Sequence, residues 1–142
     1  MLYVKDIMQT NVRTIDRKRS LKEAARLMMR WRTGSLIVLD KGKPSGIVTE
    51  GDISRAVAKG ASPGRTSLRA CKKRLITIGS GSRIEEAAKL MAGEGVKKLP
   101  VVDDGQLVGI ITETDIVRSS FDLVTALKEM VRARYRPPDF VP

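Results

Sequence analysis

One eight-residue phrase occurs twice in this chain, and its repetition constrains the fold more than any other feature. GIVTEGDI occupies residues 46–53 and returns as GIITETDI at residues 109–116. The offset from 46 to 109, which is 63 residues, holds without a gap from residue 12 to residue 55, and it relates LKEAARLM to IEEAAKLM. Because a fixed internal period indicates a repeat architecture, we expect two copies of one structural unit.

Each copy reads as a strand, a helix, two strands and a second helix. The apolar residues of the first helix recur at helical spacing, and two short apolar runs around a Gly-containing turn indicate a hairpin. We predict an α/β (α+β) fold of two β-α-β-β-α repeats related by a pseudo-twofold axis. The expected elements are strands 12–15 and 75–78, helices 21–32 and 84–94, hairpin strands 36–39 with 46–49 and 99–102 with 109–112, and helices that begin near residues 52 and 115.

The stretch KGASPGRTS, rich in Gly, Ser and Pro, indicates a linker between the copies. We predict repeat 1 at residues 1–60, a linker at 61–67, repeat 2 at 68–120, and a C-terminal helix with a basic, proline-containing tail at 121–142. One face of that helix is apolar, which suits either a cover over the core or contact with another subunit. The residues on this face are Phe121, Val124, Leu127 and Val131.

Composition excludes several classes of function. The 142 residues contain no histidine and one cysteine, Cys71, so an internal disulfide, a Ser-His-Asp triad and the common zinc sites are excluded. We therefore expect no enzyme and no metal site. No apolar run approaches the roughly 20 residues needed to cross a bilayer, so a cytoplasmic protein without a membrane partner is expected. The 27 Lys and Arg against 16 Asp and Glu, a net charge of +11, suit a polyanionic partner.

A Thr-x-x-Asp pattern stands where a helix begins in both copies, as Thr49 with Asp52 and Thr112 with Asp115. In one interpretation it is a capping box, which stabilises a helix by about 1 kcal/mol. In the other, the helix N-terminus and the Thr hydroxyl bind a phosphate while the carboxylate accepts hydrogen bonds from two ribose hydroxyls. Capping boxes are also expected at the earlier helix of each copy, from Ser20 with Glu23 and from Ser82 with Glu85.

Together these motifs resemble the CBS domain. The two copies of the phrase match the family's G-h-h-[ST]-x-x-D signature, where h is an apolar residue, and KKLPVVDDG matches its h-P-V-h-D segment. VKDIM and the two EAA helices also fit, so the resemblance covers residues 4–118. It implies a tandem CBS pair, also called a Bateman module, that binds AMP, ADP, ATP or S-adenosylmethionine as a regulatory ligand, with no resident cofactor.

The resemblance also implies roles for individual residues. Asp52 and Asp115 would hold the ribose, and Thr49, Thr112, Lys97 and Lys98 would contact phosphate. The base and the cleft wall would involve Thr14, Thr77, Ser35, Leu36, Leu99, Pro100, Ile47 and Ile110.

The two implied clefts differ in sequence. In the family, the Asp of one repeat is completed by a strand of the other. One cleft would therefore combine Thr49 and Asp52 with Lys97 and Lys98, and we expect it to bind phosphate more strongly. The other would combine Thr112 and Asp115 with Gly34, Ser35 and Leu36, which bring no charge.

The expected partners are an adenosine-containing small molecule, a second copy of the chain in a homodimer, and an unidentified protein that receives the signal. Nucleic acid is the alternative partner. The net charge and the RARYR run near the C-terminus support it, whereas the lack of an aromatic-rich strand weakens it. An affinity for nucleic acid that falls steeply with salt would favour this alternative.

Overall fold

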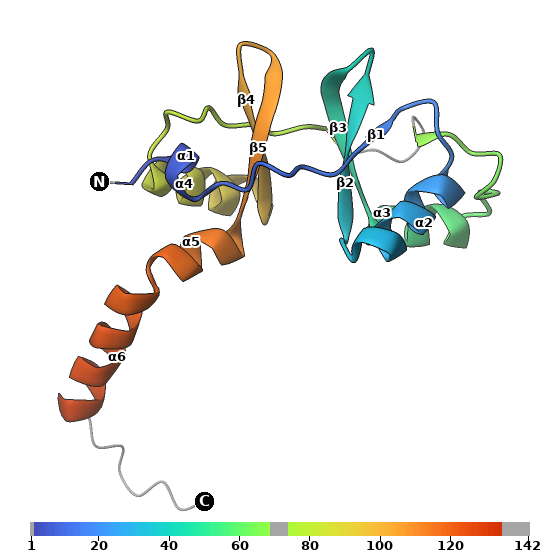
Figure 1. Ribbon diagram of the computed structural model, residues 1–142. Helices are drawn as coiled ribbons and strands as arrows, with labels where there is room; N and C mark the ends of the chain where they lie inside the picture. Colours follow the sequence, from blue (N-terminus) through green and yellow to red (C-terminus); the bar gives the residue numbers. More distant parts are fainter. Residues whose placement is uncertain (1, 69–73, 135–142) are drawn as a thin grey trace, which may run out of the picture.

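The computed structural model describes residues 2–68 and 74–134 and contains two similar halves side by side (Figure 1). The predicted fold of two α/β repeats is confirmed. One sheet has the strand order β1-β2-β3, and the other consists of β4 and β5. The elements are α1 (Val4–Ile7), β1 (Thr14–Asp16), α2 (Leu21–Trp31), β2 (Ser35–Asp40), β3 (Lys43–Thr49), α3 (Glu50–Ala58), α4 (Ile84–Glu94), β4 (Lys98–Asp103), β5 (Gln106–Thr112), α5 (Glu113–Ser119) and α6 (Phe121–Arg134).

Each repeat has its own aliphatic core, and the two cores correspond position by position. Repeat 1 packs α2 and α3 against its sheet, and repeat 2 packs α4 and α5 in the same way. Most core positions are related by the 63-residue offset, as Leu36 is to Leu99. The first core contains Ile15, Leu21, Ala24, Met28, Leu36, Val38, Val48 and Leu68, and the second contains Val4, Ile78, Ala87, Met91, Leu99, Val101 and Ile111.

The segment that leads into each repeat packs on the other repeat. Val4 of α1 is fully buried in the core of repeat 2, and its backbone N–H donates to Ser82 O at 2.8 Å. Leu68, just after the linker, is fully buried in the core of repeat 1, and its N–H donates to Arg19 O at 3.1 Å. Each core is therefore completed by a residue that belongs in sequence to the other repeat.

The strand predicted at residues 75–78 is not formed. Only Ile78 pairs with β4, as an isolated parallel bridge to Val101. In repeat 1 the N–H of Ile37 donates to Arg13 O at 3.0 Å and extends the pairing of β1. The equivalent residue of repeat 2 is Pro100, which has no N–H, so this first hydrogen bond of the strand is lost.

The predicted capping boxes have mixed outcomes. Ser20 is the N-cap of α2 and accepts from Glu23 N at 3.2 Å. The box predicted from Ser82 and Glu85 is wrong, because α4 begins after Arg83, which makes no side-chain capping bond. The helices expected near residues 52 and 115 begin two residues earlier.

Helix α6 extends away from the two repeats (Figure 1). Its side chains from Lys128 to Ala133 are exposed, so this half does not cover the core, and Met130 and Val131 retain 51% and 61% exposure. The side chains of Phe121, Val124 and Leu127, all of Cys71, and the tail at 135–142 lie outside the described residues. No helix within 2–68 and 74–134 is long and apolar enough to cross a membrane.

Candidate functional site: two clefts between the repeats

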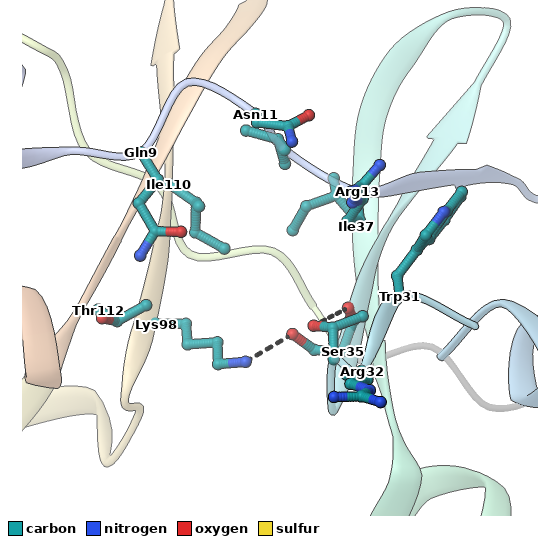
Figure 2. A pocket seen from close by; sticks show the side chains of 12 residues that line it. Gln9, Asn11, Arg13, Trp31, Arg32, Ser35, Ile37, Lys98, Ile110 and Thr112 are labelled. Atoms are coloured by element: carbon teal, nitrogen blue, oxygen red, sulfur yellow. Dashed lines mark hydrogen bonds between the residues drawn. The ribbon is translucent and has the colours of Figure 1, made fainter. Parts of the chain in front are cut away.

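Two clefts lie where the repeats meet, and each takes residues from both. The Thr112 cleft, with a volume of about 370 Å³, is shown in Figure 2. The Thr49 cleft has a volume of about 350 Å³. The first is lined by Gln9, Asn11, Val12, Arg13, Trp31, Arg32, Thr33, Ser35, Ile37, Lys98, Ile110 and Thr112, and the second by Gly34, Ser35, Ile47, Thr49, Arg74, Leu75, Ile76, Gly95, Val96, Lys97, Lys98 and Pro100.

The two clefts are pseudo-symmetric copies of each other. Moving along the chain by 63 residues in either direction converts most of one lining into the other. Ile47 corresponds in this way to Ile110, and Val12 corresponds to Leu75. Both volumes fall in the range typical of small-molecule sites. The repeated phrase thus contributes one threonine and one isoleucine to each cleft.

The Thr-x-x-Asp pattern forms a capping box in both repeats. Asp52 N donates to Thr49 Oγ1 at 3.2 Å, and Thr49 N donates back to Asp52 Oδ2 at 2.9 Å. The second repeat has the same pair of bonds at 3.1 and 2.9 Å, between Thr112 and Asp115. Each threonine hydroxyl accepts one bond here and keeps its own proton for another acceptor.

The second oxygen of each aspartate has a different partner. Asp52 Oδ1 accepts from the Arg55 guanidinium at 2.6 Å, whereas Asp115 Oδ1 accepts from Gln9 Nε2 at 3.0 Å. Both carboxylates are buried, at 6% and 8% exposure, and neither lines the main volume of a cleft in this arrangement. Asp115 instead faces an adjoining hollow, and Gln9 borders both this hollow and the Thr112 cleft.

The helix N-termini present fewer free amides than the sequence suggested. Glu50 N donates to Gly34 O at 3.0 Å, and Glu113 N donates to Lys97 O at 2.8 Å. With the third amide held by the threonine, two of the first three N–H groups of α3 and of α5 are already used. Side chains rather than backbone amides are therefore the main donors for an anion.

Among the residues that the structure describes, three cationic residues line each cleft. Lys97, Lys98 and Arg74 line the Thr49 cleft, as Lys98, Arg13 and Arg32 line the Thr112 cleft. The expected difference in the number of cations is therefore not seen between the described parts of the two linings. Gly34 and Ser35 do stand at the positions that Lys97 and Lys98 occupy in the other repeat. The arginines, however, come from segments outside the hairpin strands.

Trp31 adds an aromatic wall to the Thr112 cleft. The Arg13 guanidinium lies 4.7 Å from the centre of its ring, within the range of a cation–π contact. Arg32 follows as the C-cap of α2 and adopts a left-handed conformation, with φ of 51°. Trp31 and Arg32 reach the cleft because α2 ends at its rim.

The predicted wall residues divide into two groups. Ser35, Pro100, Ile47 and Ile110 line the clefts, as do Thr49, Thr112, Lys97 and Lys98. Leu36 and Leu99 do not, because strand alternation turns them into the two cores and leaves Ile37 and Pro100 at the clefts. Thr14 borders a separate groove, and exposed Thr77 lines neither cleft.

Several lining residues were missed from sequence. Arg13 immediately precedes β1, and Arg74 lies three residues before Thr77, so both are close to Thr14 and Thr77, the residues predicted for the cleft wall. Trp31, the single tryptophan of the chain, was the available signal, since tryptophan combines a large apolar ring with a polar N–H and is enriched at interfaces. No group of three or more His, Cys, Asp or Glu that could hold a metal occurs within the described ranges.

Known proteins share this arrangement of two repeats. The CBS domain family matches residues 4–59 and 68–122. The chain belongs to the CBS-domain family. As a CBS pair it is 32% identical to the CBS domain-containing protein YhcV of Bacillus subtilis over 117 residues, which cover 82% of this chain and 84% of YhcV.

Two further proteins are similar to this chain. The uncharacterized protein MK0525 of Methanopyrus kandleri is 35% identical over 103 residues, which cover 70% of this CBS pair and 53% of MK0525, so this chain spans about half of that relative. The CBS domain pair of protein MJ0100, solved in complex with 5′-methylthioadenosine and S-adenosyl-L-methionine, has a TM-score of 0.78 and 29% identity. That match covers 87% of this chain and 98% of the MJ0100 pair.

Proposed function

We propose that this CBS pair is a regulatory, non-catalytic module that binds adenosine-containing ligands in its two clefts. One observation carries the proposal. Among the described residues, each cleft brings together the threonine that caps a helix, three cationic side chains and an apolar wall. The ligands of the MJ0100 pair, which both contain adenosine, support the class of ligand. Ligand binding would change how the repeats pack, and a protein partner would respond to that change.

The charge of the clefts favours AMP, ADP or ATP over S-adenosylmethionine. Three cations in each cleft attract a phosphate and repel a sulfonium. The threonine hydroxyl is available to donate to a phosphate oxygen, and Lys97 and Lys98 reach the same region of the Thr49 cleft. The half-buried Ile47 and Ile110 offer apolar surface to an adenine ring.

In each cleft, a ribose would bind the aspartate by replacing the side chain that now donates to its Oδ1 oxygen. The Arg55 side chain is 58% exposed where it meets Asp52, so its guanidinium can return to water when a ribose hydroxyl takes its place. In the second repeat the replaced group is the Gln9 amide, which already borders the cleft. In both cases Oδ2 keeps its capping bond to the threonine N–H.

Isothermal titration calorimetry with AMP, ADP, ATP and S-adenosylmethionine tests this function. We expect micromolar binding of a nucleotide, weakened at least tenfold in Asp52→Ala or Asp115→Ala for the cleft concerned. Lys59→Ala, an exposed lysine outside both linings, is the control. Absence of binding by all four compounds to folded protein would reduce Thr-x-x-Asp to a helix cap.

A second candidate function is nucleic-acid binding. The net charge of +11 favours it, as does a separate groove of about 450 Å³ between β1 and α2 that is lined by Arg19, Arg26 and Arg30. Asp16 and Glu23 in the same groove oppose it. Electrophoretic mobility shifts whose affinity falls steeply with salt would support this function, and equal affinity at 50 and 200 mM salt would exclude it.

A homodimer is the expected assembly. The surface between α4 and α5 is mainly apolar and includes Met91, Val96 and Val117, the last of which is 57% exposed. A second copy would cover this surface together with the exposed apolar residues of α6. Light scattering coupled to size exclusion should give twice the monomer mass of 15.6 kDa, and Val117→Glu should shift the mass toward the monomer.

A further inference from the structure

Lys98 lies between the two clefts and contacts both. Its Nζ donates to Ser35 Oγ at 3.0 Å, and this bond runs across the boundary between the repeats (Figure 2). Lys98 and Ser35 both line both clefts. The two residues are related by the 63-residue offset, so their hydrogen bond lies at the pseudo-twofold axis.

The other cations of the clefts are not shared. Arg13 and Arg32 line the Thr112 cleft alone, and Arg74 and Lys97 line the Thr49 cleft alone. Within residues 2–68 and 74–134, Lys98 is thus the one positively charged side chain that lines both. Its hydrogen-bond partner is the neutral hydroxyl of Ser35, which binds an ammonium less strongly than a phosphate does. A phosphate in either cleft would therefore compete with Ser35 for Lys98.

We propose that Lys98 is a shared phosphate ligand that makes binding in the two clefts anticooperative. This inference rests on the proposed function, since it requires a phosphate-bearing ligand in each cleft. The first ligand neutralises the ammonium at the axis. The second then meets a less positive cleft and also the negative charge of the first, so we expect its binding to be about tenfold weaker than in a protein with an empty neighbouring cleft.

The charge of the ligand sets the size of this coupling. Adenosine has no phosphate, so its binding in one cleft should leave the affinity of the other unchanged. AMP and ATP should show the effect, and added salt should reduce it because ions screen the repulsion between the two ligands. A coupling caused by a change of shape would instead persist with adenosine.

The test compares the wild-type protein with single-cleft variants by calorimetry. Asp52→Ala leaves the Thr112 cleft as the working site, and Asp115→Ala leaves the Thr49 cleft. For AMP, the product of the two stepwise association constants of the wild type should be about tenfold lower than the product of the two single-cleft constants. When Lys98→Met is added to the wild type and to both single-cleft variants, the ratio of these products should rise toward one, because only the repulsion between the two ligands remains. Lys97→Met, which alters the Thr49 cleft alone, is the matched control and should keep the anticooperativity.

Trp31 supplies a second measurement that does not depend on the aspartate variants. As the single tryptophan, it lines the Thr112 cleft only, so its fluorescence reports filling of that cleft while calorimetry counts both. Filling of the two clefts should be separated in concentration with AMP, and Lys98→Met should bring the two curves closer together. Lys97→Met provides the same control here.

The outcomes separate the two proposals. Independent AMP binding in both clefts, with a ratio of one in the wild type, overturns the coupling and leaves the proposed function standing. The coupling is likewise overturned if only one cleft binds and just one of the two Asp→Ala variants loses binding. A complete lack of nucleotide binding to folded protein overturns the proposed function, and the coupling with it.

Discussion

Repeat 1 and repeat 2 hold the same carboxylate at the end of their first hairpin strand, but with different partners. In repeat 1, Asp40 accepts from the Arg17 guanidinium at 2.9 Å, and its other oxygen is buried with no partner in the described part of the chain. In repeat 2, Asp103 accepts from the hydroxyl and the N–H of Ser80, at 2.5 and 3.0 Å. The backbone position has been kept while the chemistry around it has changed.

The same contrast recurs where the first helix of each repeat ends. Gly95 ends α4 in the left-handed conformation with φ of 66°, which is the usual residue for that cap. Arg32 ends α2 in the same conformation with φ of 51°, although a side chain is unfavourable there. Arg32 also lines the Thr112 cleft. At these two positions repeat 2 thus has the better hydrogen-bonded carboxylate and the more favourable helix cap. Repeat 1 instead places the charged side chain of Arg32 in a cleft.

The largest effect is expected where the repeats exchange core residues. Leu68→Ala should lower the free energy of unfolding by about 3 kcal/mol and Val4→Ala by about 2 kcal/mol, because each empties space in the opposite core. Leu2→Ala, at a position that is 45% exposed, is the control. Urea denaturation followed by circular dichroism would measure both. Two separate transitions, one for each repeat, would break the picture of interdependent cores.

The glycine of the repeated phrase offers the next largest effect. A Cβ at Gly109 would lie 2.6 Å from Met8 Sδ and 2.9 Å from the Gln9 carbonyl oxygen, where the N-terminal segment crosses β5. Gly109→Ala should therefore lower the free energy of unfolding by about 2 kcal/mol. Gly93→Ala is the matched control, because its Cβ would meet open space in α4 and should stabilise. An equal effect of the two substitutions on the melting temperature would refute the close packing.

The residues at the two helix C-caps can be exchanged between the repeats. Arg32→Gly should raise the free energy of unfolding by about 1 kcal/mol, and Gly95→Arg should lower it by about the same amount. Arg32→Gly should also weaken nucleotide binding in the Thr112 cleft, since it removes one of three cations. Thermal melts and calorimetry on the same preparations measure both quantities. A stabilised variant with unchanged binding would remove Arg32 from the cleft's function.

The smallest effect concerns acid stability. The hydroxyl of Ser80, and then its N–H, hold the pKa of Asp103 below its ordinary value of 3.8. A carboxyl whose folded-state pKa is lowered stabilises the protein above its unfolded pKa, and this contribution is lost as the pH falls through the folded value. Ser80→Ala should therefore make stability less sensitive to pH below about pH 4. Urea midpoints between pH 2 and 6 would measure this, and an unchanged acid limb would count against it.

The repeat offset predicted the hairpins, most core positions and the helix-capping threonines, because all of these features depend on local patterns that both copies preserve. The orientation of Leu36 and Leu99 was not predicted. Ser35 to Val38 are all buried, and the run from Leu36 to Leu39 is apolar throughout, so hydropathy within this run did not distinguish the side that faces the core from the side that faces the cleft. Arg13 and Trp31 were missed because their places depend on how the two repeats pack, which no local pattern encodes. The crossed lead-in segments escaped detection for the same reason, since α1 has only four residues.

The exchange of Val4 and Leu68 between the two cores affects how the chain can assemble. The segment that leads into each repeat fits the core of the other repeat and not its own. A lone repeat could therefore complete its core only by exchanging this segment with another copy. The linker turns this exchange between molecules into an exchange within one molecule, at an effective concentration in the millimolar range. Cutting the chain in the linker would therefore make the stability of the fold, and of both clefts, depend on protein concentration.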